Sequence, residues 1–408
     1  MLAVKIPKNS QCLVRQALAC GGLVGLLLIS ACDQAEDAAI DSDDSVPGSG
    51  VQSDWPLFRG DPQMQGVSPE SISPPLELVW SHEPVVEEGK RRPPIEASPV
   101  IADGIVFVGT QGGQFLALSL ETGDLNWSIG TEGPVTAPAA VDAGTVYFGD
   151  TYGFVYALDA LTGEENWRYE TDGKIEGGVN IFTGKDGKTK VFVGSHDYYL
   201  YCLDAETGEV VWKEETGNYI VSTPSIIDQG DSQAVCFGGC DGLLYVIPTS
   251  GRGEKKEIEI GSYIANSSAV RDGIAYMAHN GGEVLALDIE SGETVWRQAT
   301  GVEYTASPAV DETHVYVAGP DKRLVAYDRI LGEADWAFTA PRALDSSPVI
   351  AGDTIWQGGT DGRIYAIDRR DGKELWSFEL GAQIKASPAV SRGALVVCGQ
   401  DGVVYAFR

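Results

Sequence analysis

The chain contains the stretch Ala157-Leu158-Asp159-Ala160-Leu161-Thr162-Gly163-Glu164-Glu165-Asn166-Trp167, and this pattern decides the fold. An apolar run ends at an aspartate, a Thr-Gly pair follows, and a tryptophan stands shortly after the glycine. The pattern returns around Trp212 and Trp296. Asp and Thr side chains bond to the backbone of tight turns, and glycine tolerates a positive φ there. Each copy therefore predicts two strands joined by a tight turn.

The pattern belongs to a longer repeat that occupies most of the 408 residues. Tryptophans recur in phase at Trp127, Trp167, Trp212, Trp296, Trp336 and Trp376. Pairs of small residues, most of them with proline, also recur in phase, from Ser98-Pro99 to Ser387-Pro388. In the fourth unit the run Glu257-Ile258-Glu259-Ile260 stands where the tryptophan is expected. Fixed-period repeats of this length indicate a solenoid or a propeller, and the small pairs predict eight units.

Each unit holds four short apolar runs separated by turns rich in Gly and Asp, as in residues 139–169. Runs of this length bounded by turn residues are typical of antiparallel strands. Four strands in a repeat of about 40–45 residues make one blade of a β-propeller. The sequence therefore predicts an all-β fold, with residues 55–408 forming a single eight-bladed β-propeller.

The eighth unit ends with the chain at Val404-Tyr405-Ala406-Phe407, before its fourth strand. The segment Leu76–Trp80 has the composition of the missing strand, including its tryptophan. An unpaired sheet edge favours association with other chains, and ring closure removes that edge. We therefore expect Leu76–Trp80 to complete the last blade.

The first residues have the features of a targeting signal and are not expected to belong to the folded domain. Three basic residues precede the apolar run 17–29, which is too short to span a bilayer and is typical of a signal peptide over residues 1–31. The following Ser30-Ala31-Cys32 resembles a bacterial lipobox, which makes Cys32 the expected lipidation site. A plain secretory signal cut nearby is the alternative. Residues 32–54 are acidic and predict a disordered tether.

These features place the chain in the bacterial cell envelope, lipid-anchored on the periplasmic side, with the inner or outer membrane left open. The formal net charge of −30 repels phosphate backbones, so nucleic acid is not an expected partner. With 4 His and 3 Met the chain has few of the residues that ligate copper, haem or zinc in a histidine-rich site. No hydrolase, phosphate-loop or zinc-protease motif occurs. We predict no catalytic, cofactor-binding or metal residues, and buried free cysteines, although the disulfide state of Cys236 and Cys240 stays open.

Loops in the third to fifth units depart from the repeat, both between second and third strands and between blades. In a propeller these two loop sets share one face, around the mouth of the channel. Functional residues collect on loops that a rigid scaffold carries, and these loop sequences suit a peptide, a protein strand or a polar ligand. Unusual turns without a ligand are the plain alternative. The candidate partner-face residues are His196, Asp197, Tyr198, Tyr219, Cys240, Asp241, Tyr263 and Asn266.

The tryptophans receive a different interpretation, because a residue repeated in nearly every unit has a packing role. A large apolar indole suits the joint between neighbouring wedge-shaped blades. The predicted docking residues are Trp80, Trp127, Trp167, Trp212, Trp296, Trp336 and Trp376.

The repeated string Ala-x-Asp-x-x-Thr-Gly-x-x-x-Trp resembles the tryptophan-docking motif of the PQQ-repeat, or quinoprotein-like, propeller family, over Leu76 to Arg408. That family includes dehydrogenases that use pyrroloquinoline quinone (PQQ) and Ca²⁺. It also includes cofactor-free BamB-like envelope lipoproteins of outer-membrane protein assembly. The dehydrogenases are longer and stack the quinone against two adjacent half-cystines, and this chain has no adjacent Cys pair.

The resemblance implies a non-catalytic, monomeric scaffold that presents propeller loops to envelope proteins, with the β-barrel assembly machinery as the implied partner. A PQQ-dependent alcohol or sugar dehydrogenase and a carbohydrate-binding propeller are the alternatives. The segment Asp54–Gly60 resembles the start of many bacterial PQQ-repeat proteins. We expect it to cover one end of the ring.

Overall fold

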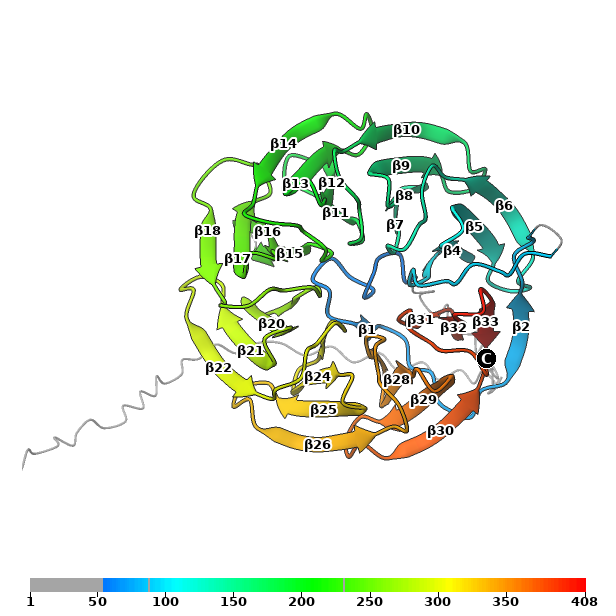
Figure 1. Cartoon of the computed structure of the whole chain (residues 1–408). Helices are drawn as coiled ribbons and strands as arrows, with labels where there is room; N and C mark the ends of the chain where they lie inside the picture. The colour runs from blue at the N-terminus through cyan, green and yellow to red at the C-terminus, as the bar shows by residue number, and fades with distance from the viewer. Residues whose placement is uncertain (1–53, 87–88, 230–231) are drawn as a thin grey trace, which may run out of the picture. The chain divides into compact units, whose positions relative to one another are not determined.

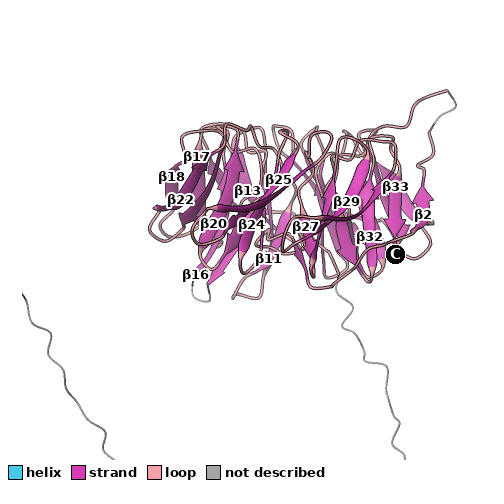
Figure 2. Ribbon diagram, turned by 90° about the horizontal axis from the view of Figure 1, so that it is seen from below, coloured by secondary structure: helices cyan, strands magenta, loops and turns pink. Residues whose placement is uncertain are grey.

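The computed structural model describes residues 54–86, 89–229 and 232–408. The predicted signal peptide, Cys32 and the tether up to residue 53 lie outside this part. The described residues form strands and turns, gathered into eight sheets around a central axis (Figure 1). Seen from the side, the strands run between two faces that carry the loops (Figure 2). The predicted all-β, eight-bladed propeller is confirmed. Among the described residues no helix is long and apolar enough to cross a membrane.

Blades 1 to 4 follow one another along the chain, each from its inner to its outer strand. Blade 1 contains β3 (Val100–Ala102), β4 (Ile105–Gly109), β5 (Gln114–Ser119) and β6 (Leu125–Gly130). Blade 2 contains β7 (Ala140–Asp142), β8 (Thr145–Gly149), β9 (Phe154–Asp159) and β10 (Glu165–Glu170). Blade 3 contains β11 (Asn180–Thr183), β12 (Thr189–Gly194), β13 (Tyr199–Asp204) and β14 (Val210–Glu215). Blade 4 contains β15 (Ser225–Gln229), β16 (Ser232–Gly238), β17 (Leu243–Pro248) and β18 (Lys256–Glu259).

Blades 5 to 8 continue the same order and close the ring. Blade 5 contains β19 (Ala269–Arg271), β20 (Ile274–His279), β21 (Glu283–Asp288) and β22 (Thr294–Ala299). Blade 6 contains β23 (Ala309–Val310), β24 (His314–Ala318), β25 (Arg323–Asp328) and β26 (Ala334–Thr339). Blade 7 contains β27 (Val349–Ala351), β28 (Thr354–Gly358), β29 (Arg363–Asp368) and β30 (Glu374–Glu379), with β1 (Val67–Ser68) as a fifth strand. Blade 8 contains β31 (Ala389–Ser391), β32 (Ala394–Cys398), β33 (Val404–Phe407) and β2 (Leu78–His82).

The last blade takes its outer strand from the N-terminal part of the chain. Strand β2 pairs antiparallel with β33, and Trp80 stands opposite Ala406. The backbone groups of Glu77 and Arg408 extend the pairing, with N···O distances of 2.7 and 3.0 Å. The strand therefore completes blade 8 as expected, although its regular pairing begins at Leu78 rather than at Leu76.

The tryptophans lie in the seams between blades. Trp167 of blade 2 packs against Gly208 in the turn between the third and fourth strands of blade 3. Its indole N–H donates to the carbonyl of Ala205 over 2.9 Å. A Cβ on Gly208, whose φ is +73°, would lie 2.7 Å from the indole, so both the turn and the ring require glycine. Corresponding indole N–H bonds to the next blade come from Trp80, Trp127, Trp212 and Trp296.

The remaining two docking positions differ in detail. Trp336 packs against Gly372 of blade 7, but its indole nitrogen has no hydrogen-bond partner. Trp376 faces blade 8, where the chain ends in place of the turn, and its ring lies 6.1 Å from that of Phe407. Both contribute to packing between blades, without the bond to a turn carbonyl that the other tryptophans make.

The segment from Asp54 to Ile72, which we call the inner segment, includes β1 and crosses the centre of the ring (Figure 1). Its carbonyl groups accept bonds from successive inner strands, including those from Val141, Ile226, Val310 and Ile350. Trp55 and Arg59 are 2% and 1% exposed. Asp54 and Glu70 also accept bonds from turns between first and second strands, which places the segment at the face that carries those turns. This agrees with the expectation that the segment covers one end of the ring.

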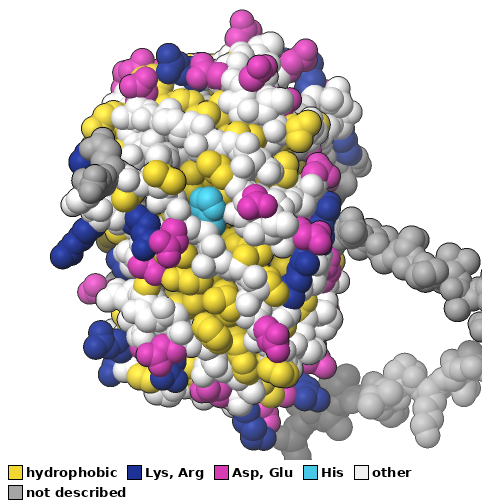
Figure 3. Space-filling model, turned by 90° about the vertical axis from the view of Figure 1, so that its right-hand side faces the viewer, with side chains coloured by type: hydrophobic (Ala, Val, Ile, Leu, Met, Phe, Trp, Pro, Cys, Tyr) yellow, Lys and Arg dark blue, Asp and Glu magenta, His cyan; other side chains and the backbone are white. Residues whose placement is uncertain are grey.

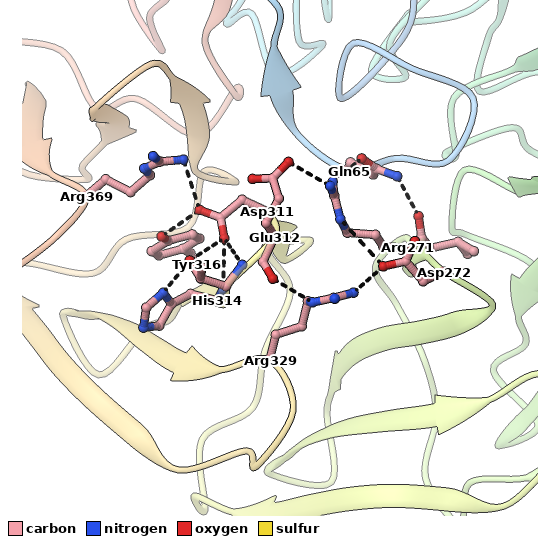
Figure 4. A network of polar contacts seen from close by, with 11 residues as sticks. Gln65, Arg271, Asp272, Asp311, Glu312, His314, Tyr316, Arg329 and Arg369 are labelled. Carbon is pink, nitrogen blue, oxygen red and sulfur yellow. Dashed lines mark hydrogen bonds and ion pairs between the residues drawn. The ribbon is translucent and has the colours of Figure 1, made fainter. Parts of the chain in front are cut away.

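The same face carries ion pairs that join neighbouring blades (Figure 4). Arg329 of blade 6 contacts Asp272 of blade 5 over 2.7 Å, and Arg271 reaches Glu312 over 2.7 Å. Arg271 also donates to Gln65 of the inner segment over 3.0 Å. The two ion pairs join blades 5 and 6, and the bond to Gln65 ties the segment to blade 5.

The outer rim shows a band of apolar side chains where β2, β6 and β30 lie (Figure 3). Its exposed members on these strands are Leu78, Val79, Leu125 and Leu375. They belong to outer strands, one edge of which is unpaired in every blade of a propeller.

Candidate functional site

A pocket of about 620 Å³ lies over blades 3 to 5. It is on the face opposite the turns between first and second strands, which contact the inner segment. The loops around it join second to third strands and one blade to the next; we call this side of the ring the pocket face. The lining residues are Glu176, His196, Asn218, Tyr219, Val221, Cys240, Tyr263, Ala265 and Thr305. Four of the eight predicted partner-face residues, His196, Tyr219, Cys240 and Tyr263, therefore meet in one pocket.

Aromatic rings form much of the pocket wall. The His196 ring stacks on Tyr219 with centroids 4.5 Å apart, and the Tyr198 ring is tilted against Tyr219 with centroids 5.2 Å apart. Tyr219 and Tyr263 are 43% and 45% exposed although both are large aromatic residues. Tyr198 has a φ of +76°, so its turn holds a bulky residue in the left-handed region. The arrangement leaves part of each of these two tyrosine side chains open to solvent.

Two predicted partner-face residues hold the loops. The Asp197 carboxylate accepts bonds from the Tyr201 hydroxyl over 2.7 Å and from the backbone of Asp172 over 3.0 Å. Asp241 accepts corresponding bonds from the Tyr245 hydroxyl and from Gly217. Burial and the neighbouring carboxylate raise the pKa of both tyrosines, so each hydroxyl keeps its proton and donates. Neither aspartate lines the pocket.

Asn266 is likewise built into the scaffold. It is buried, and its amide nitrogen donates to the carbonyls of Ala278 and Ala306. It lines a smaller cavity of about 170 Å³ in the central channel, with Phe58 of the inner segment in its wall. Around this cavity the serine or threonine hydroxyl of one blade accepts the backbone N–H of the preceding blade, as between Ser307 and Ser267 at 3.0 Å.

The mouth of the channel carries one loop position that recurs in every blade. Glu96 and Glu176 occupy equivalent positions, one residue after the buried Ile95 and Ile175. Glu96 is paired with Lys385, with 3.2 Å between Nζ and Oε1. Glu176 instead lies 3.0 Å from Nε2 of His196, which carries a charge only when protonated. The pocket thus contains a carboxylate without a permanently charged partner in its lining.

The cysteines are free thiols in the described part of the chain. Cys202, Cys236 and Cys398 are buried, whereas Cys240 is half-exposed in the pocket, so the expectation of burial holds for three of the four. Burial, together with the charges of Asp241 and Glu176, raises the pKa of the Cys240 thiol. Burial raises the pKa of Cys236 to about 12. These thiols stay protonated at neutral pH and are poor nucleophiles.

The described residues contain no group of three or more His, Cys, Asp and Glu side chains arranged to hold a metal ion.

Two residues that line the pocket, Glu176 and Asn218, were not among the site residues predicted from the sequence. A signal for Glu176 was present beside it, because Gly177-Gly178 replaces the small residue and proline of most other units.

Comparison with solved structures identifies the same architecture. BamB from Moraxella catarrhalis aligns with a TM-score of 0.68 and 20% identity, over 82% of this chain and 99% of that one. Quinohemoprotein alcohol dehydrogenase from Comamonas testosteroni aligns with a TM-score of 0.71 and 17% identity, over 87% and 80%. A europium-containing methanol dehydrogenase aligns with a TM-score of 0.72 and 14% identity, over 87% of this chain and 98% of that one. At these identities the likeness shows the fold alone.

The sequence itself adds a family assignment. No curated protein matches the chain. A family model described as outer membrane protein assembly factor BamB matches residues 77–180, 153–231 and 249–408, which together are more than half of the chain. The chain therefore belongs to this PQQ-repeat family.

Proposed function

We propose that the protein is a non-catalytic scaffold of the bacterial cell envelope, which binds protein partners through its pocket face. The family whose model matches the chain is described as an outer-membrane assembly factor, so we place the partners among the proteins of β-barrel assembly. Lipidation of Cys32 anchors the chain to a membrane in this proposal, and the acidic tether sets its reach.

The observation that carries the proposal is the pocket with its exposed tyrosines. Tyr219 and Tyr263 are partly exposed and line a hollow that is open to solvent. Aromatic residues in such hollows are characteristic of the energetic centres of protein interfaces. The loops beneath them are held by partly buried carboxylate–tyrosine bonds, so little conformational freedom is lost when a partner binds.

We also propose that the chain works without PQQ and Ca²⁺. The channel cavity of about 170 Å³ is smaller than the ~300–1,000 Å³ of typical ligand pockets. Its serine hydroxyls already accept backbone N–H groups, and Phe58 of the inner segment fills part of the wall. The residues there do not fit the quinone and its metal. Quinone absorbance on the protein after addition of PQQ and Ca²⁺, with dye-coupled alcohol or sugar oxidation, would contradict this.

The test of the scaffold proposal is site-specific photo-crosslinking in the envelope. A photoreactive amino acid replaces Tyr219 in the pocket or Tyr152, an exposed tyrosine between the second and third strands of blade 2 that does not line the pocket. We expect position 219 to crosslink to a β-barrel assembly protein and position 152 to give far less product. Equal yields from both positions, or none from 219, would contradict the proposal.

The anchor requires a separate measurement. We expect incorporation of labelled palmitate into the chain and its loss in Cys32→Ala. Fractionation of inner and outer membranes then assigns the compartment.

A further inference from the structure

We propose that the pocket receives an arginine side chain from the protein partner, with the guanidinium group against Tyr219 and Tyr263 and facing Glu176. The inference rests on the proposed function, because it names the chemistry by which the pocket face recognises its partner. It concerns a ligand group that the pocket residues select, independently of which protein carries it.

The first argument is charge. Around the channel mouth, Glu96 already has a lysine partner at 3.2 Å, whereas the contact that Glu176 makes is with the histidine ring. The described lining of the pocket contains this carboxylate and neither lysine nor arginine. An incoming cation would supply the counter-charge that Lys385 supplies to Glu96. A carboxylate in a partly desolvated hollow gains more from such a pair than one in open water.

Cys240, which also lines the pocket, lies in the field of Glu176 and of a second carboxylate. Burial is the main cause that raises the pKa of the Cys240 thiol, and the carboxylates of Asp241 and Glu176 add to it, so these two charges oppose a further negative charge beside the thiol. The whole chain carries a net charge of −30, which attracts cationic surfaces from a distance.

The second argument is shape. Ring faces of tyrosine attract cations, and planar guanidinium groups stack on them more often than ammonium groups do. Tyr219 is held by stacking against His196 at 4.5 Å and by contact with Tyr198 at 5.2 Å, so its position is fixed before a ligand arrives. Arginine combines stacking on such rings with a forked pair of N–H donors toward a carboxylate. Lysine offers a point charge without the planar surface.

The test uses capped single amino acids, because they remove every other contact of the partner. The purified full chain is titrated with N-acetyl-arginine methylamide and followed by the chemical shifts of labelled tyrosine rings. Matched probes are the lysine derivative and the citrulline derivative, which keeps the shape of arginine without its charge. We expect binding of the arginine probe, with citrulline weaker by about tenfold or more and lysine in between.

The variants separate this pocket from the rest of the mouth. Glu176→Gln and Tyr219→Ala should each weaken binding of the arginine probe by about tenfold. Glu96→Gln removes the equivalent carboxylate that already has a lysine partner, and Tyr152→Ala removes an exposed tyrosine outside the pocket. Both should bind the probe as the unchanged chain does. Thermal unfolding of all four variants checks that each is folded.

Equal binding of arginine and citrulline, or equal weakening in Glu176→Gln and Glu96→Gln, would overturn the inference. The crosslinking assay separates it from the proposed function. If position 219 still crosslinks to an assembly protein while the arginine probe does not bind, the scaffold function stands and this recognition chemistry fails. If the probe binds but no partner is crosslinked, the scaffold function fails instead.

Discussion

Two seams of the ring solve the same packing problem with different residues. Between blades 2 and 3, Trp167 covers Gly208 and donates its indole N–H to the Ala205 carbonyl. Between blades 4 and 5, the corresponding side chain is Ile258, which is half-buried and leaves 3.7 Å to a Cβ built on Gly292.

The carbonyl that the indole would reach in blade 5 has another donor. The Lys256 ammonium donates to the carbonyl of Ile289 over 3.3 Å and to that of Glu290 over 2.6 Å. Ile289 follows Asp288 as Ala205 follows Asp204, so the two seams cap the same backbone group. The difference teaches that the tryptophans are one solution for sealing a seam and capping a turn. This agrees with a packing role for the tryptophans.

The largest effect on stability is expected from loss of ring closure, which affects every seam between blades. Deletion of residues 55–83 removes β1, β2, the inner segment and the buried Trp55 and Trp80. We expect an aggregating or unfolded chain, because blade 8 loses its outer strand and the inner strands lose their shared partner. Size-exclusion chromatography and circular dichroism measure this. A soluble monomer with cooperative unfolding would show that the eight sheets hold together without this segment.

The next effect compares the side chains of the seams directly. Trp167→Ala should lower the free energy of unfolding by about 3–5 kcal/mol, because a large buried ring and its hydrogen bond are lost. Ile258→Ala should cost clearly less, since the isoleucine is smaller and only half-buried. Urea denaturation gives both values. Similar losses would mean that the seam between blades 4 and 5 depends on its isoleucine as heavily as the other depends on its tryptophan.

The glycines under these side chains provide a matched pair. Gly208 and Gly292 have φ values of +73° and +74°, so alanine pays the same left-handed penalty of about 1–2 kcal/mol at each. Only Gly208→Ala also forces a methyl group against an indole, at 2.7 Å. We therefore expect Gly208→Ala to shift the urea midpoint further than Gly292→Ala. Equal shifts would remove the steric role assigned to the tryptophan.

The smallest effect concerns the lysine of the unusual seam. Lys256→Met keeps much of the aliphatic stem but removes the donor to the two carbonyls, and should cost about 1 kcal/mol. Lys255→Met is the control, because exposed Lys255 pairs with half-buried Glu214 and exposed Glu257 at the surface, where such pairs contribute little. A loss in Lys255→Met as large as that in Lys256→Met would argue against the carbonyl-capping role.

Much of the fold could be predicted because its determinants are local. Each turn with its Asp, Thr-Gly and tryptophan spans about ten residues. The eighth repeat ends before its fourth strand, so the sequence showed that blade 8 needed a strand from elsewhere in the chain. The departure at Ile258 was also visible as a degenerate copy. The sequence could not show that Lys256, two residues earlier, supplies the missing donor, because that contact joins two blades.

The pocket residues were likewise predicted only in part. The sequence alone determined that the loops of units three to five deviate, and hence that His196, Tyr219, Cys240 and Tyr263 share a face. Only the tertiary structure decided that Asp197, Asp241 and Asn266 hold the scaffold, and that Glu176 enters the pocket without a lysine like the one beside Glu96. The physical reason is that repetition along the chain fixes each blade from within. What a loop side chain faces depends on how the neighbouring blades are rotated about the axis, which brings residues far apart in sequence to one hollow.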